Sequence, residues 1–245
     1  MEILGIDIGG SALKGAPVDV DKGALTAERY RVEMPKSSVP EAVGDCVANL
    51  AAHFEWKGPI GCTFPGIVKK GVTLSAANVD LAWVDYPAQK MFSRKTGSRV
   101  VVLNDADAAG IAEIEFGAGK GERGVVIMLT FGTGLGSAVF INGQLVPNTE
   151  LGHLELNGKD VEKRTAARVK TEKGLSWKQW AARVNDYFAL LDFLFSPDLL
   201  IIGGGISRHN DKFLRYLKSS ARIVPAKFFN DAGIIGAALA AREHS

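Results

Sequence analysis

The strongest constraint on the fold is the way in which short apolar runs alternate with amphipathic stretches along the chain. Apolar runs this short predict buried strands rather than helices, and their alternation with helical patterns predicts an α/β protein. We expect strands at Ile3 to Ile8, Pro59 to Thr63, Val100 to Leu103, Val125 to Thr130, Ser137 to Ile141 and Leu199 to Ile202. Because 47% of the 245 residues are apolar, the chain can bury a sizeable core.

Two helices are predicted most clearly. Ser38 is expected to cap the first, with Pro40 in its first turn. The apolar residues that this helix should bury, at spacings of three or four, are Val43, Val47, Leu50 and Phe54. The second helix should begin near Ser176 and end before Pro197. Its apolar stripe, which we interpret as core, consists of Trp177, Trp180, Val184, Tyr187, Leu191 and Phe195.

A weak internal repeat predicts two lobes. The segments IDIGGSALKGAPVD and LTFGTGLGSAVFIN each indicate a strand, a glycine turn and a second strand, and another turn signal follows each. We place a small N-terminal lobe at residues 1–106 and a large C-terminal lobe at residues 107–232. A last helix, opened by the glycines at Gly233 to Gly236, is expected to complete the first lobe with residues 233–245.

Charge and cysteine content argue against several classes of protein. The net charge of +2 is too small to indicate nucleic-acid binding, although it is compatible with a local anion site. Cys46 and Cys62 are far apart, and no cysteines and histidines have zinc-ligand spacing. Because the sequence shows neither a signal peptide nor a long apolar run, we expect a cytoplasmic protein without a membrane segment.

Three glycine motifs are candidate phosphate sites, because glycine lets backbone N–H groups approach an anion. Each has a structural alternative: a hairpin turn for the first two and a sharp strand-to-helix turn for the third. The motifs consist of Asp7, Gly9, Gly10, Ser11 and Lys14; of Gly132, Thr133, Gly134 and Gly136; and of Gly203, Gly204 and Gly205. In the first motif, Asp7 can also orient a hydrated Mg²⁺ ion. The second is neither a P-loop nor a dinucleotide fingerprint.

Carboxylates and one histidine are candidates for catalysis and ligand binding. Asn104 and Asp105 close an apolar strand, and ligands of α/β sheets bind at such strand ends. A carboxylate there can accept a hydroxyl proton during phosphoryl transfer, or it can simply cap the next helix. Glu150 and His153 can pair with neighbouring hydroxyls of a sugar, whereas an isolated histidine is usually structural.

The order and spacing of these motifs resemble the ROK family of sugar kinases, in the actin/hexokinase-like (ribonuclease H-like) superfamily. The resemblance covers nearly the whole chain and implies a two-lobed α/β fold with an interlobe cleft. It rests on the Asp7 to Gly10 turn, Thr63-Phe64-Pro65-Gly66, Asn78 with Trp83, Asn104-Asp105, the Gly132 to Gly136 turn, Glu150-Leu151-Gly152-His153 and the triple glycine at 203.

The resemblance also implies roles for these residues. Asp105 would be the general base on the 6-hydroxyl of the sugar, and the turns at Asp7 to Gly10 and Gly132 to Gly136 would clamp the donor phosphates. The expected sugar contacts are Thr63, Pro65, Gly66, Asn78, Asn104, Asp105, Glu150, His153 and Glu162. By analogy with related kinases, we expect a homodimer.

One departure from the family pattern indicates which branch of the family the chain resembles. Most ROK kinases carry a cysteine-rich zinc motif after the Glu-x-Gly-His segment, whereas LELNGKDVEKRTAARVKTEKG contains no cysteine, so no structural zinc is expected. This shortened segment, together with FGTGLGSAVFINGQLVPNTELGHLEL, resembles the polyphosphate glucokinase branch of the family. That resemblance implies phosphoryl transfer from inorganic polyphosphate to glucose, with ATP as a second donor and mannose as a second acceptor.

The same segment contains a basic run. A linear polyanion needs such a basic track, although a solvated helix face accounts for the same charges. The cations are Lys159, Lys163, Arg164, Arg168, Lys170 and Lys173, against the acids Asp160, Glu162 and Glu172.

Three alternatives stay open. The nearest is an ATP-dependent hexose or N-acetylhexosamine kinase of the same family. A sugar-sensing repressor would need a DNA-binding helix-turn-helix, for which a strand that starts at Ile3 leaves no room before it. An actin-like or exopolyphosphatase-like hydrolase would not need Glu150 and His153.

Overall fold

The computed structural model describes residues 1–76 and 79–242. The chain separates into two compact units. Unit 1 contains Met1–Ala112 together with the chain from Asp231 onward, and unit 2 contains Glu113–Asn230.

Unit 1 is built on a mixed sheet with the strand order β3-β2-β1-β5-β8, in which β4 also pairs with β2. β1 (Glu2–Ile8), β5 (Ile60–Phe64) and β8 (Val100–Asn104) run parallel to one another. β2 (Ala12–Asp19) returns antiparallel to β1. The remaining strands are β3 (Ala24–Leu25), β4 (Tyr30–Glu33) and the separate pair β6 (Val68–Lys69) and β7 (Val72–Thr73).

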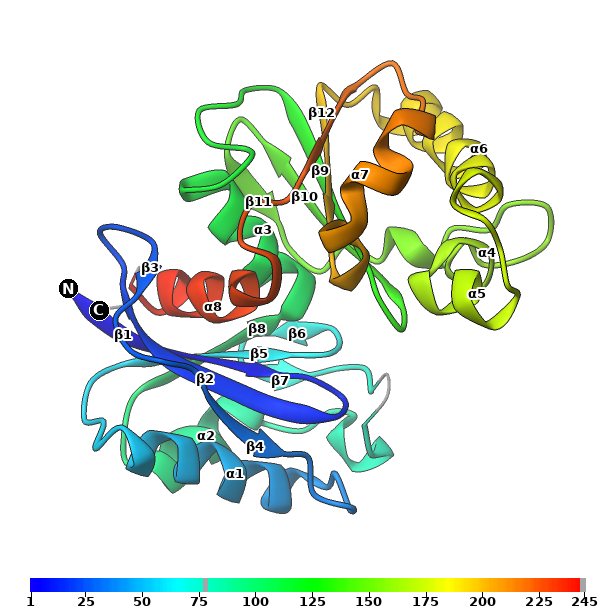
Figure 1. Cartoon of the computed structure of the whole chain (residues 1–245). Coiled ribbons are helices and arrows are strands. Elements are labelled where there is room, and N and C mark those ends of the chain that lie inside the picture. Colours follow the sequence, from blue (N-terminus) through cyan, green and yellow to red (C-terminus); the bar gives the residue numbers. More distant parts are fainter. Residues whose placement is uncertain (77–78, 243–245) are drawn as a thin grey trace. The chain divides into compact units, whose positions relative to one another are not determined.

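Helices cover both faces of this sheet (Figure 1). α1 (Pro40–His53) and α2 (Ala88–Thr96) pack on one face, and α8 (Ala232–Arg242) packs on the other against β1 and β5. The α8 backbone lies so close to the sheet that a Cβ atom at Gly5 would be 2.0 Å from the carbonyl oxygen of Ile234. A Cβ atom at Gly61 would be 1.8 Å from that of Ala237, so both strand positions require glycine.

Unit 2 is built on a sheet with the order β11-β10-β9-β12-β13. β9 (Val125–Phe131), β10 (Leu135–Ile141) and β11 (Gln144–Val146) form antiparallel pairs. β12 (Leu199–Gly203) joins β9 in parallel, and β13 (Arg222–Pro225) extends the parallel part. The long helix α6 (Trp177–Phe195) packs its apolar face into the core next to β9 and β12.

Short helical segments connect these elements. The α-helices are α3 (Asp105–Glu115), α4 (Glu162–Thr165), α5 (Ala167–Glu172) and α7 (Asn210–Phe213). The 3₁₀ turns are η1 (Leu81–Trp83), η2 (Leu151–His153), η3 (Gly205–His209), η4 (Leu214–Tyr216) and η5 (Phe229–Asp231). Within the described residues, every helix is too short or too polar to cross a lipid bilayer.

The predicted α/β class is confirmed, and each predicted strand is present with its ends shifted by two residues at most. The start of α6 is also confirmed, because Ser176 and Gln179 form a capping box. The predicted cap of α1 is wrong. Val39 precedes that helix without a capping side chain, while the Ser38 hydroxyl accepts a hydrogen bond from the Asp80 N–H at 3.0 Å. Ser38 is one residue too far from the helix, so its oxygen holds the segment before η1 instead.

Candidate active site

The parallel strands of unit 1 bring the predicted residues of this unit to one edge of the sheet. β1, β5 and β8 are neighbours in register, so their carboxyl ends lie side by side, about 4.8 Å apart from strand to strand. Asp7 and Ile8 end β1, Thr63 and Phe64 end β5, and Asn104 ends β8.

Asp7 is held by a buried threonine. The Thr63 hydroxyl donates a hydrogen bond to Asp7 Oδ1 at 2.9 Å and accepts one from the Ile8 N–H at 2.9 Å. Burial raises the pKa of the Asp7 carboxyl, while the hydrogen bond from Thr63 and the charge of Lys14 lower it. Lys14 lies opposite Asp7 in the β1–β2 pair. Thr63 is fully buried with its hydroxyl engaged on both sides, so the structure favours a positioning role over the predicted sugar contact.

The first glycine motif is a tight hairpin between β1 and β2. The Gly9 N–H donates to the carbonyl of Ala12 at 3.1 Å, and this bond closes the turn. Gly10 and Ser11 are exposed at its tip. The predicted phosphate turn is therefore an accessible hairpin beside Asp7 and Lys14.

Asp105 is the first residue of α3, and Asn104 fixes its place. Asn104 Oδ1 accepts hydrogen bonds from the N–H groups of Ala106 at 2.8 Å and of Asp107 at 3.0 Å, so this amide caps the helix. Asn104 Nδ2 donates to the Gly66 carbonyl at 3.1 Å. The buried Asn104 thus ties the turn that contains Pro65 and Gly66 to the start of α3, which favours a positioning role over the predicted sugar contact. Asp105 itself is partly exposed, and its carboxylate accepts from the Ala106 N–H at 2.8 Å.

In unit 2, two glycine turns follow neighbouring parallel strands. Thr130 of β9 and Gly203 of β12 are partners in the ladder, so the turn at Gly132 to Gly134 and the turn at Gly203 to Gly205 leave the same edge of the sheet. The first turn is closed by a hydrogen bond from the Gly132 N–H to the Gly134 carbonyl at 3.0 Å, and Thr133 is exposed at its tip. Gly136 lies in β10.

The segment with α4 and α5 supports the first of these turns. Glu162 Oε2 accepts a hydrogen bond from the Leu135 N–H at 2.9 Å. The Arg168 N–H donates to the Gly132 carbonyl at 3.1 Å. Glu162 is predicted as a sugar ligand, whereas in this structure one of its oxygens braces the glycine turn.

Glu150 and His153 lie at the two ends of the η2 turn. A Cβ atom at Gly152 would be 2.3 Å from the Leu135 carbonyl oxygen, so the glycine of this motif lets η2 approach β10. Burial raises the pKa of the Glu150 carboxyl, the electrostatic interaction with His153 lowers it, and the nearby Glu162 raises it further. His153 Nδ1 lies 3.6 Å from the Asp160 carboxylate. This cluster offers carboxylates and an imidazole to a polyhydroxylated ligand.

Comparison with known proteins identifies the chain's family. The profile of the ROK family matches residues 3–169. The chain belongs to the ROK family. It is 46% identical to the polyphosphate glucokinase of Mycobacterium tuberculosis over 237 residues, which cover 96% of this chain and 89% of that protein.

Solved ROK structures show the same fold. The inorganic polyphosphate/ATP-glucomannokinase of Arthrobacter sp. strain KM superposes with a TM-score of 0.95 at 45% identity, over 100% of this chain and 99% of that one. A ROK family glucokinase from Streptomyces griseus, solved with glucose and AMPPNP, has a TM-score of 0.84 at 24% identity, over 99% and 100% of the two chains. The predicted actin/hexokinase-like fold of ROK kinases is confirmed.

Of the predicted site residues, Asn78 lies outside the described residues. Two further contacts were not predicted from the sequence. Asp160 pairs with His153, and Arg183 of α6 joins the cations of the basic run in one pocket. No sequence signal could have found Arg183, because it stands amid the helical pattern that we interpreted as core.

Proposed function

We propose that this chain is a polyphosphate-dependent glucokinase, which transfers the terminal phosphoryl group of inorganic polyphosphate to the 6-hydroxyl of glucose. The observation that carries the proposal is the 46% identity to a polyphosphate glucokinase over 96% of the chain. The ROK motifs in the described residues lie at strand ends or in tight turns, and ligands of α/β sheets bind at such strand ends.

On the acceptor side, we assign Asp105 as the general base. Its carboxylate stands at the carboxyl end of β8, where the Asn104 cap fixes the start of α3. A base here takes the proton as the 6-hydroxyl attacks phosphorus, and the leaving phosphate chain carries away the displaced bond's electron pair. Glu150 and His153 are assigned to ring hydroxyls, and Pro65, Gly66 and Asn78 are assigned as further sugar contacts.

On the donor side, we assign the glycine motifs to phosphate oxygens. The Gly132 and Gly9 N–H groups close their own turns, so we assign phosphate contacts to the rest of each turn: to Thr133 and Gly134, to Gly10 and Ser11, and to the turn at Gly203 to Gly205.

Mg²⁺ fits this site as an ion held mainly through water and phosphate. No cluster of three or more acidic, cysteine or histidine side chains suited to a metal occurs among the described residues. Mg²⁺ commonly uses one or two carboxylates plus substrate phosphates, and Asp7, oriented by Thr63, suits that role. When bound, the ion would neutralise charge on the donor oxygens. We expect removal of Mg²⁺ to stop turnover and a zinc-selective chelator to leave it unchanged.

A similar solved structure favours ATP as a second donor and mannose as a second acceptor. The similar Arthrobacter structure is that of a polyphosphate/ATP-glucomannokinase, so ATP and mannose are candidate substrates of this chain. The test supplies glucose or mannose with either long-chain polyphosphate or ATP and compares the four initial rates. Sugar 6-phosphate formed with ATP but not with polyphosphate would contradict the polyphosphate assignment. Phosphate release without sugar would contradict the assignment as a kinase.

The expected homodimer is tested separately, by light scattering after gel filtration.

A further inference from the structure

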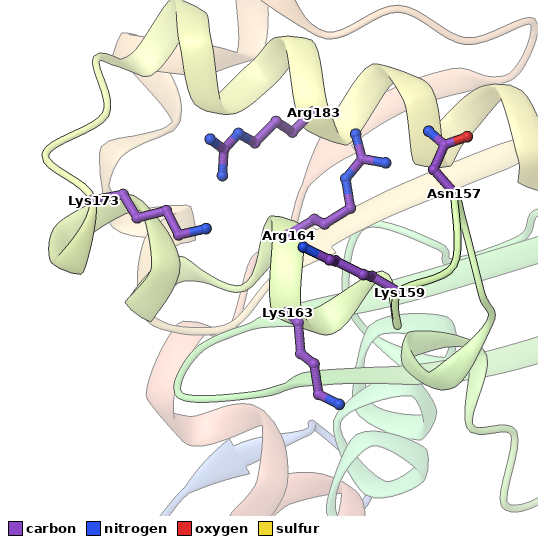
Figure 2. A pocket seen from close by; sticks show the side chains of 6 residues that line it. All are labelled: Asn157, Lys159, Lys163, Arg164, Lys173 and Arg183. Carbon is purple, nitrogen blue, oxygen red and sulfur yellow. The ribbon is translucent and has the colours of Figure 1, made fainter.

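Unit 2 contains a strongly basic pocket that none of the roles above uses. Its volume is about 680 Å³, and it is lined by Asn157, Lys159, Lys163, Arg164, Lys173 and Arg183 (Figure 2). Apart from Asn157, every lining side chain is cationic and none is acidic, although the whole chain has a net charge of only +2. So many charges of one sign raise the local concentration of anions.

Segments from different parts of unit 2 build this pocket. Lys159 follows a tight turn in which Asn157 and Gly158 have φ angles of 56° and 71°. Arg164 belongs to α4, Lys173 follows α5, and Arg183 belongs to α6. Figure 2 shows Lys159 and Lys173 reaching toward Arg164 from opposite sides, whereas Lys163 extends away from the others.

Buried and paired groups hold the frame of the pocket. The Trp180 indole N–H donates to the Thr165 carbonyl at 2.7 Å, which joins α6 to α4. The Arg164 guanidinium donates to the Asp186 carboxylate at 3.0 Å, which joins the same two helices at the pocket wall. Because these elements are already fixed, a ligand would not have to order them.

The ion pairs divide the cations into two groups. Arg164 pairs with Asp186 at 3.0 Å, Lys163 with Asp160 at 3.4 Å, and Arg168 with Glu172 at 3.7 Å. Lys170 lies over the Trp177 ring, 4.1 Å from its centroid. In the part of the chain that the structure describes, Lys159, Lys173 and Arg183 have no carboxylate within 4 Å. These three cations are therefore the ones available to an anionic ligand.

The pocket and the glycine turn share one supporting segment. Glu162 and Arg168, which hydrogen-bond to the turn, flank Lys163 and Arg164 in the chain. The segment with α4 and α5 therefore connects the pocket to the glycine turn through hydrogen bonds.

We infer that this pocket is a subsite for the distal phosphates of a long polyphosphate chain whose terminal group reacts at the glycine turn. The inference rests on the proposed function. A linear polyphosphate carries negative charge along its whole length, whereas the charge of ATP ends at the ribose, so the pocket's chemistry favours polyphosphate. The set of cations in the pocket therefore differs from the basic run predicted from the sequence. Arg183 is added, whereas Arg168 pairs with Glu172 and Lys170 lies over the Trp177 ring.

The test neutralises the three available cations together, as Lys159→Gln, Lys173→Gln and Arg183→Gln. A matched control replaces three exposed lysines outside the pocket, as Lys178→Gln, Lys212→Gln and Lys218→Gln. For each protein, kcat and KM are measured against polyphosphate chain length and with ATP. Binding of fluorescently labelled long-chain polyphosphate is measured separately by anisotropy, without sugar.

We expect KM for long chains to rise by roughly tenfold to a hundredfold in the pocket variant, with kcat unchanged, because a remote contact binds substrate and transition state equally. Short chains and ATP should change little, and the loss should shrink as salt rises. Equal losses at all lengths, or the same loss in the control, would overturn the subsite. If the unmodified protein phosphorylates no sugar from polyphosphate, the proposed function fails. The anisotropy measurement then decides the subsite, because equal affinity of all three proteins would overturn it.

Discussion

Unit 1 and unit 2 fix their candidate site residues by different means. In unit 1, buried polar side chains hold the candidate residues in place: Thr63 donates to Asp7, and Asn104 caps the helix that Asp105 begins. In unit 2, the candidate donor site is the backbone of a turn, and a carboxylate from a short helix braces it through the Leu135 N–H. Its cations lie in an open pocket rather than in the core.

This difference predicts how each unit responds to change. A buried polar side chain that loses its partner costs folding free energy, so positioning and stability are coupled in unit 1. Exposed cations contribute little to folding, so the pocket of unit 2 can change its charge while the fold stays intact. We therefore expect substitutions that change donor preference to cost less stability than substitutions around Asp105, the proposed general base.

The largest expected effect is that of Asp105→Asn in unit 1. We expect kcat to fall by roughly 10²–10⁴-fold, the usual cost of losing a general base. The fold should survive, because Asn104 Oδ1 still caps α3. Initial rates of glucose 6-phosphate formation and thermal melts measure both quantities, with Asp211→Asn on the surface of unit 2 as control. Near-normal turnover of a folded variant would remove Asp105 from the mechanism.

Thr63→Val tests the coupling of stability and positioning in unit 1. It leaves the buried Ile8 N–H without its acceptor and Asp7 without its donor, at a cost of about 1–3 kcal/mol in the free energy of unfolding. The Mg²⁺ concentration for half-maximal rate should rise several-fold, and Thr63→Ser should restore it. If urea unfolding shows the loss while the Mg²⁺ dependence stays unchanged, Thr63 supports only the fold.

Substitutions of Glu162 test whether its hydrogen bond to the Leu135 N–H supports the glycine turn of unit 2. Glu162→Ala removes the acceptor of the Leu135 N–H, whereas Glu162→Gln keeps an oxygen that can accept. We expect the alanine variant to raise KM about tenfold for polyphosphate and ATP alike, in line with the loss of one hydrogen bond to the turn, and the glutamine variant to change it less. A rise confined to the glucose KM would instead support the sugar contact predicted from the sequence.

The smallest expected effect is a pH-dependent gain of stability in Glu150→Gln. Burial raises the pKa of this carboxyl above its ordinary 4.5, so the folded chain holds the proton at pH values where the unfolded chain has lost it. The contribution of Glu150 to stability therefore falls as pH rises from 4.5 to the raised pKa, and then stays constant. The glutamine variant should melt at a higher temperature at pH 7, and the difference should vanish below pH 4.5. Its glucose KM should rise.

The sequence predicts the central strands well, because strands such as Leu199–Gly203 are buried throughout and form continuous apolar runs. It also predicts that motifs such as Asn104-Asp105 stand at strand ends, and the structure has Asn104 at the end of β8. The supporting contacts could not be predicted. Thr63 and Asp7 are far apart in the chain, and only the parallel pairing of β1 and β5 brings them together.

Local signals were less reliable where two partners compete for one side chain. Ser38 has the residue type of a helix cap, but its hydroxyl oxygen accepts a hydrogen bond from the Asp80 N–H instead. Lys170 and Arg168 belong to the basic run by composition, while Trp177 and Glu172 engage them in the fold. Charge counts in a sequence cannot reveal such pairings, because they depend on which elements pack together.

The close packing of α8 on β1 and β5 has a consequence for biosynthesis. Synthesis proceeds from the N-terminus, so the sheet of unit 1 is made long before the helix that covers one of its faces. Until Ile234 and Ala237 emerge from the ribosome, the small residues Gly5 and Gly61 lie on an uncovered face that is open to incorrect partners. Unit 2 is continuous in the chain and is complete before α8 is made, so we expect unit 1 to reach its final packing after unit 2 during translation.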